Sequence, residues 1–242
     1  MKKIIYPFSV FILFGLSGCA ELQQVANQMP GILNESGQIG QNQIAQALKQ
    51  ALNQGVDKQV SKLTKTNGFL NNNLVKIGLP SELQQIESTL RSVGLGSLAD
   101  EGVKALNRAA ENAVKEATPI FIDAIKGMTI SDATNILMGN QNAATAYLER
   151  TTSKALYSKF NPVIKNSFDK VGADKIWANI ITQYNSIPMV KKVNPDLTDY
   201  VTQQALSGVY KMIEQEELNI RKNASSRTTD LMKSVFSMQD KK

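Results

Sequence analysis

Asn107, Arg108 and Glu111 are the residues in the middle of the chain whose types and spacing could form a recognition site. Asn107 and Glu111 are four positions apart, so a helix would place them on one face. An amide, a guanidinium and a carboxylate together could bind a ligand carboxylate or a sugar. The same groups could instead form a buried network that joins helices, because satisfied polar networks specify packing. Both interpretations remain open from the sequence.

Two more carboxylates, Asp123 and Asp132, could form the acid pair of a glycoside hydrolase, which needs a separation of about 5–9.5 Å. Asp132 also has a structural explanation, since Ser131 is expected to cap a short helix that runs to Met138, and an acid in the first turn favours the helix dipole. The candidate polar network therefore comprises Asn107, Arg108, Glu111, Asp123 and Asp132. We assign no catalytic residue. Glu217 and Arg221 form an i,i+4 pair expected at the surface or between helices.

The composition excludes several kinds of chemistry. The chain has no histidine, which excludes Ser-His-Asp and Cys-His catalysis and histidine zinc sites. The formal charge is +6, the basic residues are scattered along the chain, and aromatic residues make up only 6%. Nucleic-acid binding would need a clustered basic stripe with stacking aromatics. We therefore expect no metal, no cofactor and no nucleic-acid partner.

The first residues have the pattern of a secretory leader. Lys2 and Lys3 precede a mostly apolar run from Ile4 to Leu16. This run is shorter than the roughly 20 residues needed to cross a bilayer, and its length suits a signal peptide. The run ends in Leu16-Ser17-Gly18-Cys19, which contains the only cysteine of the 242 residues.

The Leu-Ser-Gly-Cys sequence resembles the lipobox of bacterial lipoproteins. The resemblance implies that residues 1–18 are a cleaved signal peptide and that Cys19 carries acyl chains such as palmitate. Several acyl chains suffice for firm membrane attachment. Ala20, where retained lipoproteins have aspartate, implies an outer-membrane protein that faces the periplasm. With Cys19 lipidated, no thiol remains for a disulfide, so packing must supply the stability.

The remainder of the chain has the periodicity of helices. Residues 19–41 are rich in Gln, Asn and Gly and predict a tether behind the lipidated cysteine, and residues 42–242 form the helical domain. Apolar residues recur every three or four positions from Ile44 to Leu63, and Asn67-Gly68 ends that helix. A helix is expected from Ser81, and Pro162 predicts a kink or a boundary. We predict an all-α protein, a single multi-helix domain of about nine helices.

Several motifs resemble the bacterial domain-of-unknown-function 4197 family between about Ile44 and Phe236. They are Gly68-Phe69, Leu79-Pro80, Gly94-Leu95-Gly96, Leu106-Asn107-Arg108-Ala109-Ala110-Glu111, Met128 with Asp132-Ala133, Ile136-Leu137-Met138-Gly139, Ala143-Ala144-Thr145-Ala146-Tyr147, Asp196-Leu197-Thr198-Asp199-Tyr200-Val201-Thr202, Glu216 to Arg221, and Val235-Phe236. Ser207-Gly208 and Ala224 depart from the expected Asp-Gly pair and proline. The resemblance implies a helical, lipid-anchored or secreted envelope protein and implies no reaction.

These features favour a membrane-anchored, periplasm-facing helical lipoprotein that acts as a non-enzymatic binding or structural module of the cell envelope. Its expected partners are the membrane, through Cys19, and an envelope protein or an apolar ligand. Two alternatives stay open. One is a carrier or sensor whose helices enclose an apolar ligand, and the other is a carboxylate-dependent cell-wall hydrolase.

Overall fold

The computed structural model describes the chain from residue 39 to residue 240 with short gaps. The described residues are 39–80, 87, 88, 91, 92, 94, 96–170, 172–189 and 191–240. Cys19, the leader and nearly all of the expected tether lie outside them, as does most of the helix expected from Ser81.

Within the described residues the protein forms eight α-helices and one 3-10 turn and has no β-strand, so the all-α prediction is confirmed. The elements are α2 (Gln41–Leu63), α4 (Gly96–Val114), α5 (Ala117–Gly127), α6 (Ile130–Met138), α7 (Ala143–Asp169), α8 (Ala173–Asn185), α9 (Leu197–Lys222), η2 (Ala224–Ser226) and α10 (Asp230–Phe236). None of these described helices combines the length and the apolar character needed to cross a bilayer.

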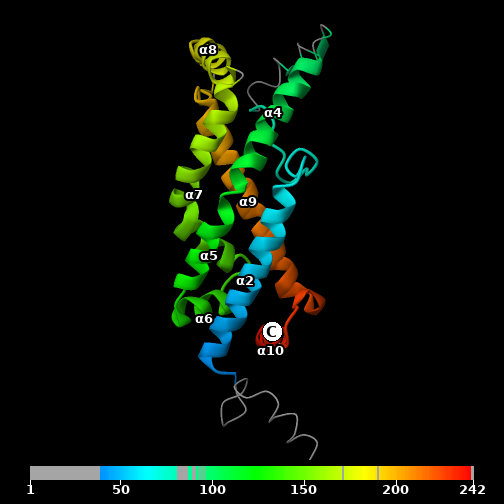
Figure 1. Cartoon of the computed structure of the whole chain (residues 1–242), viewed down its shortest axis with the longest axis vertical. Helices are drawn as coiled ribbons and strands as arrows, with labels where there is room; N and C mark the ends of the chain where they lie inside the picture. The colour runs from blue at the N-terminus through cyan, green and yellow to red at the C-terminus, as the bar shows by residue number, and fades with distance from the viewer. Residues whose placement is uncertain are drawn as a thin grey trace, which may run out of the picture. The chain divides into compact units, whose positions relative to one another are not determined.

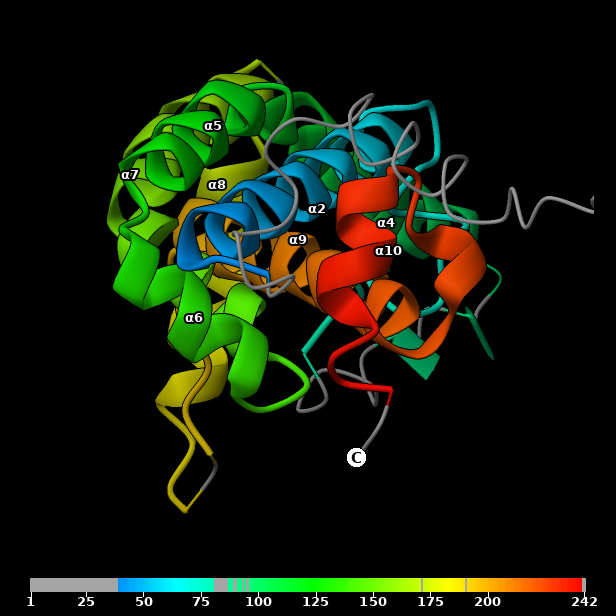
Figure 2. The same cartoon turned by 90° about the horizontal axis from the view of Figure 1, so that it is seen from below.

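Residues 41–242 form a compact unit, and α9 is its central element. It contacts α2, α4, α7 and α8, which lie around it (Figure 1, Figure 2). More than half of its residues are buried. α2 packs against α9 and also against α5, α6 and α10. A helix that is covered on several sides has few exposed positions, so α9 buries polar residues as well as apolar ones.

The apolar periodicity of α2 correctly predicts its buried face. All six residues of the expected seam are buried: Ile44, Leu48, Leu52, Val56, Val60 and Leu63. The helix ends at Leu63, and Asn67 then adopts the left-handed conformation with φ of 63°. A Cβ on Gly68 would lie 2.4 Å from the Lys62 carbonyl oxygen, so only glycine fits this close return of the chain.

The start of α6 differs from the expectation, because Thr129 and not Ser131 is its N-cap. The Thr129 Oγ1 accepts a hydrogen bond of 3.0 Å from the Asp132 amide, and the Asp132 carboxylate accepts one of 3.1 Å from the Thr129 amide. This reciprocal arrangement is a capping box. Ser131 was a plausible cap by residue type, but only a residue three positions before Asp132 can close the box.

Pro162 lies inside α7, so the helix boundary that it suggested is wrong. A proline in a helix removes one backbone hydrogen bond. Phe160, Ile164 and Phe168 are all buried, and they lie on one face before and after the proline. Burial of this continuous apolar face outweighs the cost of the missing hydrogen bond.

Gly208 marks the closest approach of α9 to the chain between α2 and α4. A Cβ on this residue would lie 2.9 Å from Phe69 Cε1 and 3.3 Å from Val75 Cβ. Phe69 is fully buried and cannot move aside, so Gly208→Ala is expected to destabilise the fold by about 1–3 kcal/mol through overpacking. Chemical denaturation measures this change.

The matched control is Gly102→Ala. Gly102 is an exposed residue of α4, and open space surrounds the position of its Cβ. Alanine there should stabilise the protein by about 0.5–1 kcal/mol because it restricts the unfolded chain. A Gly208→Ala variant that is as stable as wild type, or more stable, would contradict the close approach at Gly208.

Candidate functional site

Asn107 lies in a sealed interior and bonds to the backbone of the segment between α2 and α4. Its Nδ2 donates to the Ile77 carbonyl oxygen at 2.7 Å, and its Oδ1 accepts from the Ile77 amide at 2.8 Å. The same Nδ2 also donates to the Val103 carbonyl oxygen at 2.7 Å. The side-chain amide of Asn107 thus forms hydrogen bonds with both backbone groups of Ile77. Buried backbone groups need such partners, and in a β-sheet a neighbouring strand supplies them.

Glu111 supports the same segment one helical turn further along α4. It is buried, and its Oε1 accepts from the Phe69 amide at 3.3 Å. Arg108 lies beside it, with Nε 3.8 Å from Glu111 Oε2, but the Arg108 side chain is half exposed. Asn107, Arg108 and Glu111 therefore lie close together, as predicted. The two buried residues, Asn107 and Glu111, form hydrogen bonds with the backbone of the segment between α2 and α4.

The segment from Phe69 to Gly78 fills the space between α4 and α9 with its own apolar side chains. Phe69, Val75 and Ile77 are buried, and the Tyr200 hydroxyl of α9 donates to the Gly78 carbonyl oxygen at 2.9 Å. Side chains from two helices thus bind one non-helical segment. The arrangement has the geometry of a packing network.

A cleft of about 460 Å³ opens on the outer side of this segment. Its lining includes Lys76, Val103 and Lys104, and its charges are partly paired, since Arg91 Nη2 lies 2.6 Å from Asp100 Oδ1 and 2.8 Å from a Glu87 carboxylate oxygen. The hydrogen bond from Arg91 lowers the pKa of Asp100. α4 therefore presents its first turns to an open cleft and presents Asn107 and Glu111 to the interior.

The remaining two candidates lie on other helices. Asp123 is exposed on α5. Asp132 belongs to the capping box of α6, where hydrogen bonds from the hydroxyl and then the amide of Thr129 lower its pKa. Its carboxylate therefore has a structural role at a helix start.

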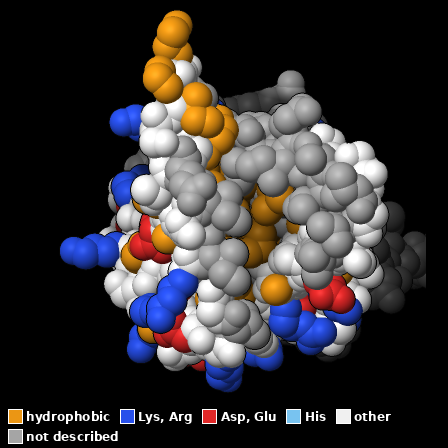
Figure 3. All heavy atoms as spheres, turned by 90° about the horizontal axis from the view of Figure 1, so that it is seen from above, with side chains coloured by type: hydrophobic (Ala, Val, Ile, Leu, Met, Phe, Trp, Pro, Cys, Tyr) orange, Lys and Arg blue, Asp and Glu red, His pale blue; other side chains and the backbone are white. Residues whose placement is uncertain are grey.

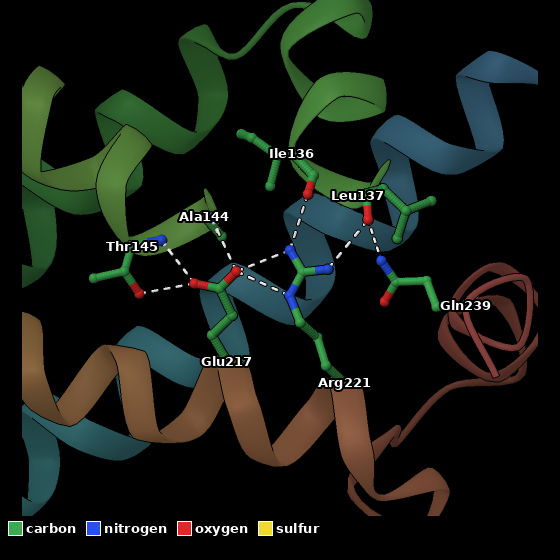
Figure 4. A network of polar contacts seen from close by, with 7 residues as sticks. All are labelled: Ile136, Leu137, Ala144, Thr145, Glu217, Arg221 and Gln239. Atoms are coloured by element: carbon green, nitrogen blue, oxygen red, sulfur yellow. Dashed lines mark hydrogen bonds and ion pairs between the residues drawn. The ribbon is translucent and has the colours of Figure 1, made fainter. Parts of the chain in front are cut away.

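The most extensive buried polar network centres on Glu217 of α9 (Figure 4). One carboxylate oxygen accepts from the Ala144 amide at 3.0 Å, and the other accepts from the amide and the hydroxyl of Thr145, both at 2.8 Å. These amides belong to the first turn of α7, where backbone donors have no partner within the helix. The negative charge of Glu217 therefore caps α7 and favours its dipole.

Arg221 completes the network at the end of α6. It donates to the Ile136 carbonyl oxygen at 2.9 Å and to the Leu137 carbonyl oxygen at 3.1 Å. Its Nη2 lies 2.8 Å from Glu217 Oε1, and both side chains are buried. Gln239, in the chain after α10, also donates to the Leu137 carbonyl oxygen (Figure 4). One ion pair thus joins the end of α6 to the start of α7.

Two more buried charged residues, Glu216 on α9 and Arg227 just after it, form hydrogen bonds with other segments. Glu216 accepts from Lys58 at 2.6 Å and from Gln59 at 2.7 Å, which ties α9 to α2. Arg227 donates to the carbonyl oxygens of Ile220 and Arg221 at 3.0 and 2.9 Å and pairs with the Asp240 carboxylate at 2.6 Å. Arg227 thereby caps the end of α9.

An apolar cavity lies beside the Glu217–Arg221 pair, between α2, α9 and α10. Its volume is about 20 Å³, and its lining includes Leu48, Leu52, Ile213 and Phe236. A space of this size holds roughly one water molecule. It cannot hold an acyl chain.

The sequence contained one signal for the burial of the Glu217–Arg221 pair. Residues 213, 217, 220 and 221 follow the spacing of a buried helical face, and Ile213 and Ile220 are its apolar members. A carboxylate and a guanidinium on that face must be buried together. The i,i+4 pairing alone did not distinguish this burial from a surface ion pair.

The family model for a protein of unknown function, DUF4197, matches residues 38–237. The chain belongs to the DUF4197 family. No curated protein and no solved structure matches this chain.

The DUF4197 match extends from just before α2 to the end of α10, so it contains every described helix. The Asn107–Glu111 network lies inside it, as does the Glu217–Arg221 network apart from Gln239, and Gln239 and Asp240 lie beyond its end. The DUF4197 description names no reaction, so function has to be argued from the sequence and the geometry.

Proposed function

We propose that the protein is a membrane-anchored, periplasm-facing lipoprotein and that its helical unit is a non-enzymatic binding or structural module of the bacterial cell envelope. The observation that carries the second part is the use of the buried polar side chains. Asn107, Glu111, Glu217, Arg221 and Arg227 each bond to backbone groups of other segments or helix ends. Groups used in this way hold helices together.

The first part of the proposal rests on Leu16-Ser17-Gly18-Cys19 behind an apolar leader. Acyl chains on Cys19 would hold the chain at a membrane, and the residues up to Gly40 would connect the anchor to α2. A unit attached in this way needs a rigid fold that survives without disulfides. Buried ion pairs at helix ends are one means of specifying such a fold.

In the part of the chain that the structure describes, the geometry at the cavity beside Glu217 and at Asp132 does not favour either alternative. A carrier of apolar ligands needs an enclosed apolar space, and the cavity beside Glu217 is too small for one. A glycoside hydrolase needs two carboxylates around a substrate, and Asp132 is bound to Thr129 in a helix cap.

Lipidation is tested by Cys19→Ala. Wild-type protein in its native host should incorporate labelled palmitate and lose residues 1–18, whereas Cys19→Ala should reduce the label to background and retain the leader. Gel autoradiography and intact mass measure the two effects. Ser9→Ala, which changes the leader but keeps the cysteine, should behave as wild type. Unlabelled wild-type protein that still carries Met1 would refute the anchor.

A further inference from the structure

The turn between α8 and α9 carries the two most exposed large apolar side chains in the described part of the chain. Ile187 is 53% exposed, and Met189 is fully exposed. Figure 2 shows this turn, in yellow, projecting beyond the neighbouring helices, and Figure 3 shows apolar side chains at the end of an arm that leaves the body. We call the described residues of this turn, 186–189, 191 and 192, the apolar finger.

The base of the apolar finger is closed by specific hydrogen bonds. Asn185 Nδ2 donates to the Val193 carbonyl oxygen at 2.7 Å, and the Val193 amide donates to Asn185 Oδ1 at 2.9 Å. Next to this closure, Trp177 Nε1 donates to the Asn194 carbonyl oxygen at 3.1 Å, and its ring stacks on Tyr200. The two ends of the finger are therefore pinned to the bundle.

The backbone at Met189 has a strained conformation. Met189 has a φ of 63°, a left-handed conformation that costs a non-glycine residue about 1 kcal/mol. Such strain persists where the surrounding structure imposes it. The fold thus holds an apolar side chain in solvent, where it gains nothing from burial within the protein.

Two lysines stand close to the apolar tip in the sequence. Lys191 and Lys192 are exposed and follow the apolar tip directly. No Asp or Glu occurs in the sequence from Lys175 to Pro195. Exposed apolar side chains beside exposed lysines suit a surface that has anionic groups on its outside and an apolar interior.

We propose that the apolar finger binds the surface of an anionic lipid bilayer, with Ile187 and Met189 among the acyl chains and Lys191 and Lys192 at the headgroups. A stable protein interface buries about 800 Å² on each partner in complementary shape. Two side chains on a narrow turn cannot supply that area. A bilayer needs no matching shape, and apolar burial and attraction of lysines to anionic lipids add together.

This contact goes beyond the proposed function and does not depend on Cys19. α8, which leads into the finger, lies at the opposite end of the helical unit from Gln41, the first residue of α2 (Figure 1). The finger would therefore be a second membrane attachment, remote from the point where the N-terminal segment joins.

The direct test places a dye at the tip. The full chain carrying Met189→Cys, labelled with an environment-sensitive fluorophore and held in phosphatidylcholine nanodiscs, is mixed with vesicles of phosphatidylethanolamine and phosphatidylglycerol. The emission should shift to the blue and rise, and vesicles of phosphatidylcholine should give a much smaller change. Met138→Cys is the matched control, because Met138 is an exposed methionine at the end of α6.

The affinity for the same anionic vesicles identifies the groups involved. Met189→Asp should weaken binding roughly tenfold or more, and Met138→Asp should leave it unchanged. Lys191→Gln with Lys192→Gln should weaken binding by roughly tenfold at low salt and reduce its salt dependence. Circular dichroism of each variant should match wild type, since the changed side chains are exposed.

Three results would overturn the proposal. They are no spectral change at residue 189 with anionic vesicles, an equal change at residue 138, and a change that follows protein concentration without vesicles. The last would indicate a second copy of the chain as the partner. Intact mass of the same samples reports whether Cys19 is acylated. The absence of acylation can therefore be distinguished from the absence of bilayer binding by the apolar finger.

Discussion

Glu217→Ala is expected to lower the free energy of unfolding by about 3–5 kcal/mol, the usual cost of removing one partner from a buried ion pair. The change leaves the Arg221 guanidinium buried without its carboxylate. It also leaves the amides of Ala144 and Thr145 without an acceptor at the start of α7. Denaturation with urea, followed by far-UV circular dichroism, measures the loss by linear extrapolation.

Asp169→Ala is the matched control for this prediction. Lys165 and Asp169 on α7 are also an i,i+4 pair with a 2.8 Å contact, but both side chains are more than half exposed. Exposed pairs contribute little to stability, so the unfolding midpoint should stay at the wild-type value. Similar losses for Glu217→Ala and Asp169→Ala would mean that the α6–α7 junction does not depend on the buried pair.

Asn107→Leu is expected to lower the free energy of unfolding by about 2–5 kcal/mol. Leucine has a similar size but cannot satisfy the amide and carbonyl of Ile77, and each unsatisfied buried group costs about 1–3 kcal/mol. Hydrogen exchange at the Ile77 amide should become faster as well. The measurement decides between a packing network and a recognition site, since residues selected for recognition often contribute nothing to stability or reduce it.

Lys104→Leu is the control, because Lys104 lies three positions before Asn107 on α4 and is exposed. A surface change of this kind stays within about 0.5 kcal/mol. If Asn107→Leu were as stable as wild type or more stable, the packing interpretation would fail and the recognition interpretation would return.

The helices were predictable wherever a continuous apolar face defined them. The seam from Ile44 to Leu63 lies on the buried face of α2, and α6 ends at Met138 as expected. Burial of an apolar face follows from the period of 3.6 residues in almost any packing arrangement. Local signals failed where packing competed with them, as at Pro162, where the buried face of α7 continues through a residue that favours a helix end.

The candidate site was only partly predictable. Spacing placed Asn107 and Glu111 on one face of a helix, but the spacing carried no information on what that face meets. Its partner is the segment from Phe69 to Gly78, which lies about 30 to 42 positions away in the sequence. Likewise, the pairing of Glu217 with Arg221 was visible, but its contacts with Thr145 and Leu137 were not.

The sequence by itself indicated that the chain is helical, that it contains no histidine, and that an apolar run from Ile4 to Leu16 is followed by its single cysteine, Cys19. These are properties of residue type and short-range order. Only the tertiary structure decided that Glu217 and Arg221 are buried and that Ile187 and Met189 are exposed. The physical reason is that the free energy of a polar or apolar group depends on which distant segment covers it, and local periodicity does not specify that segment.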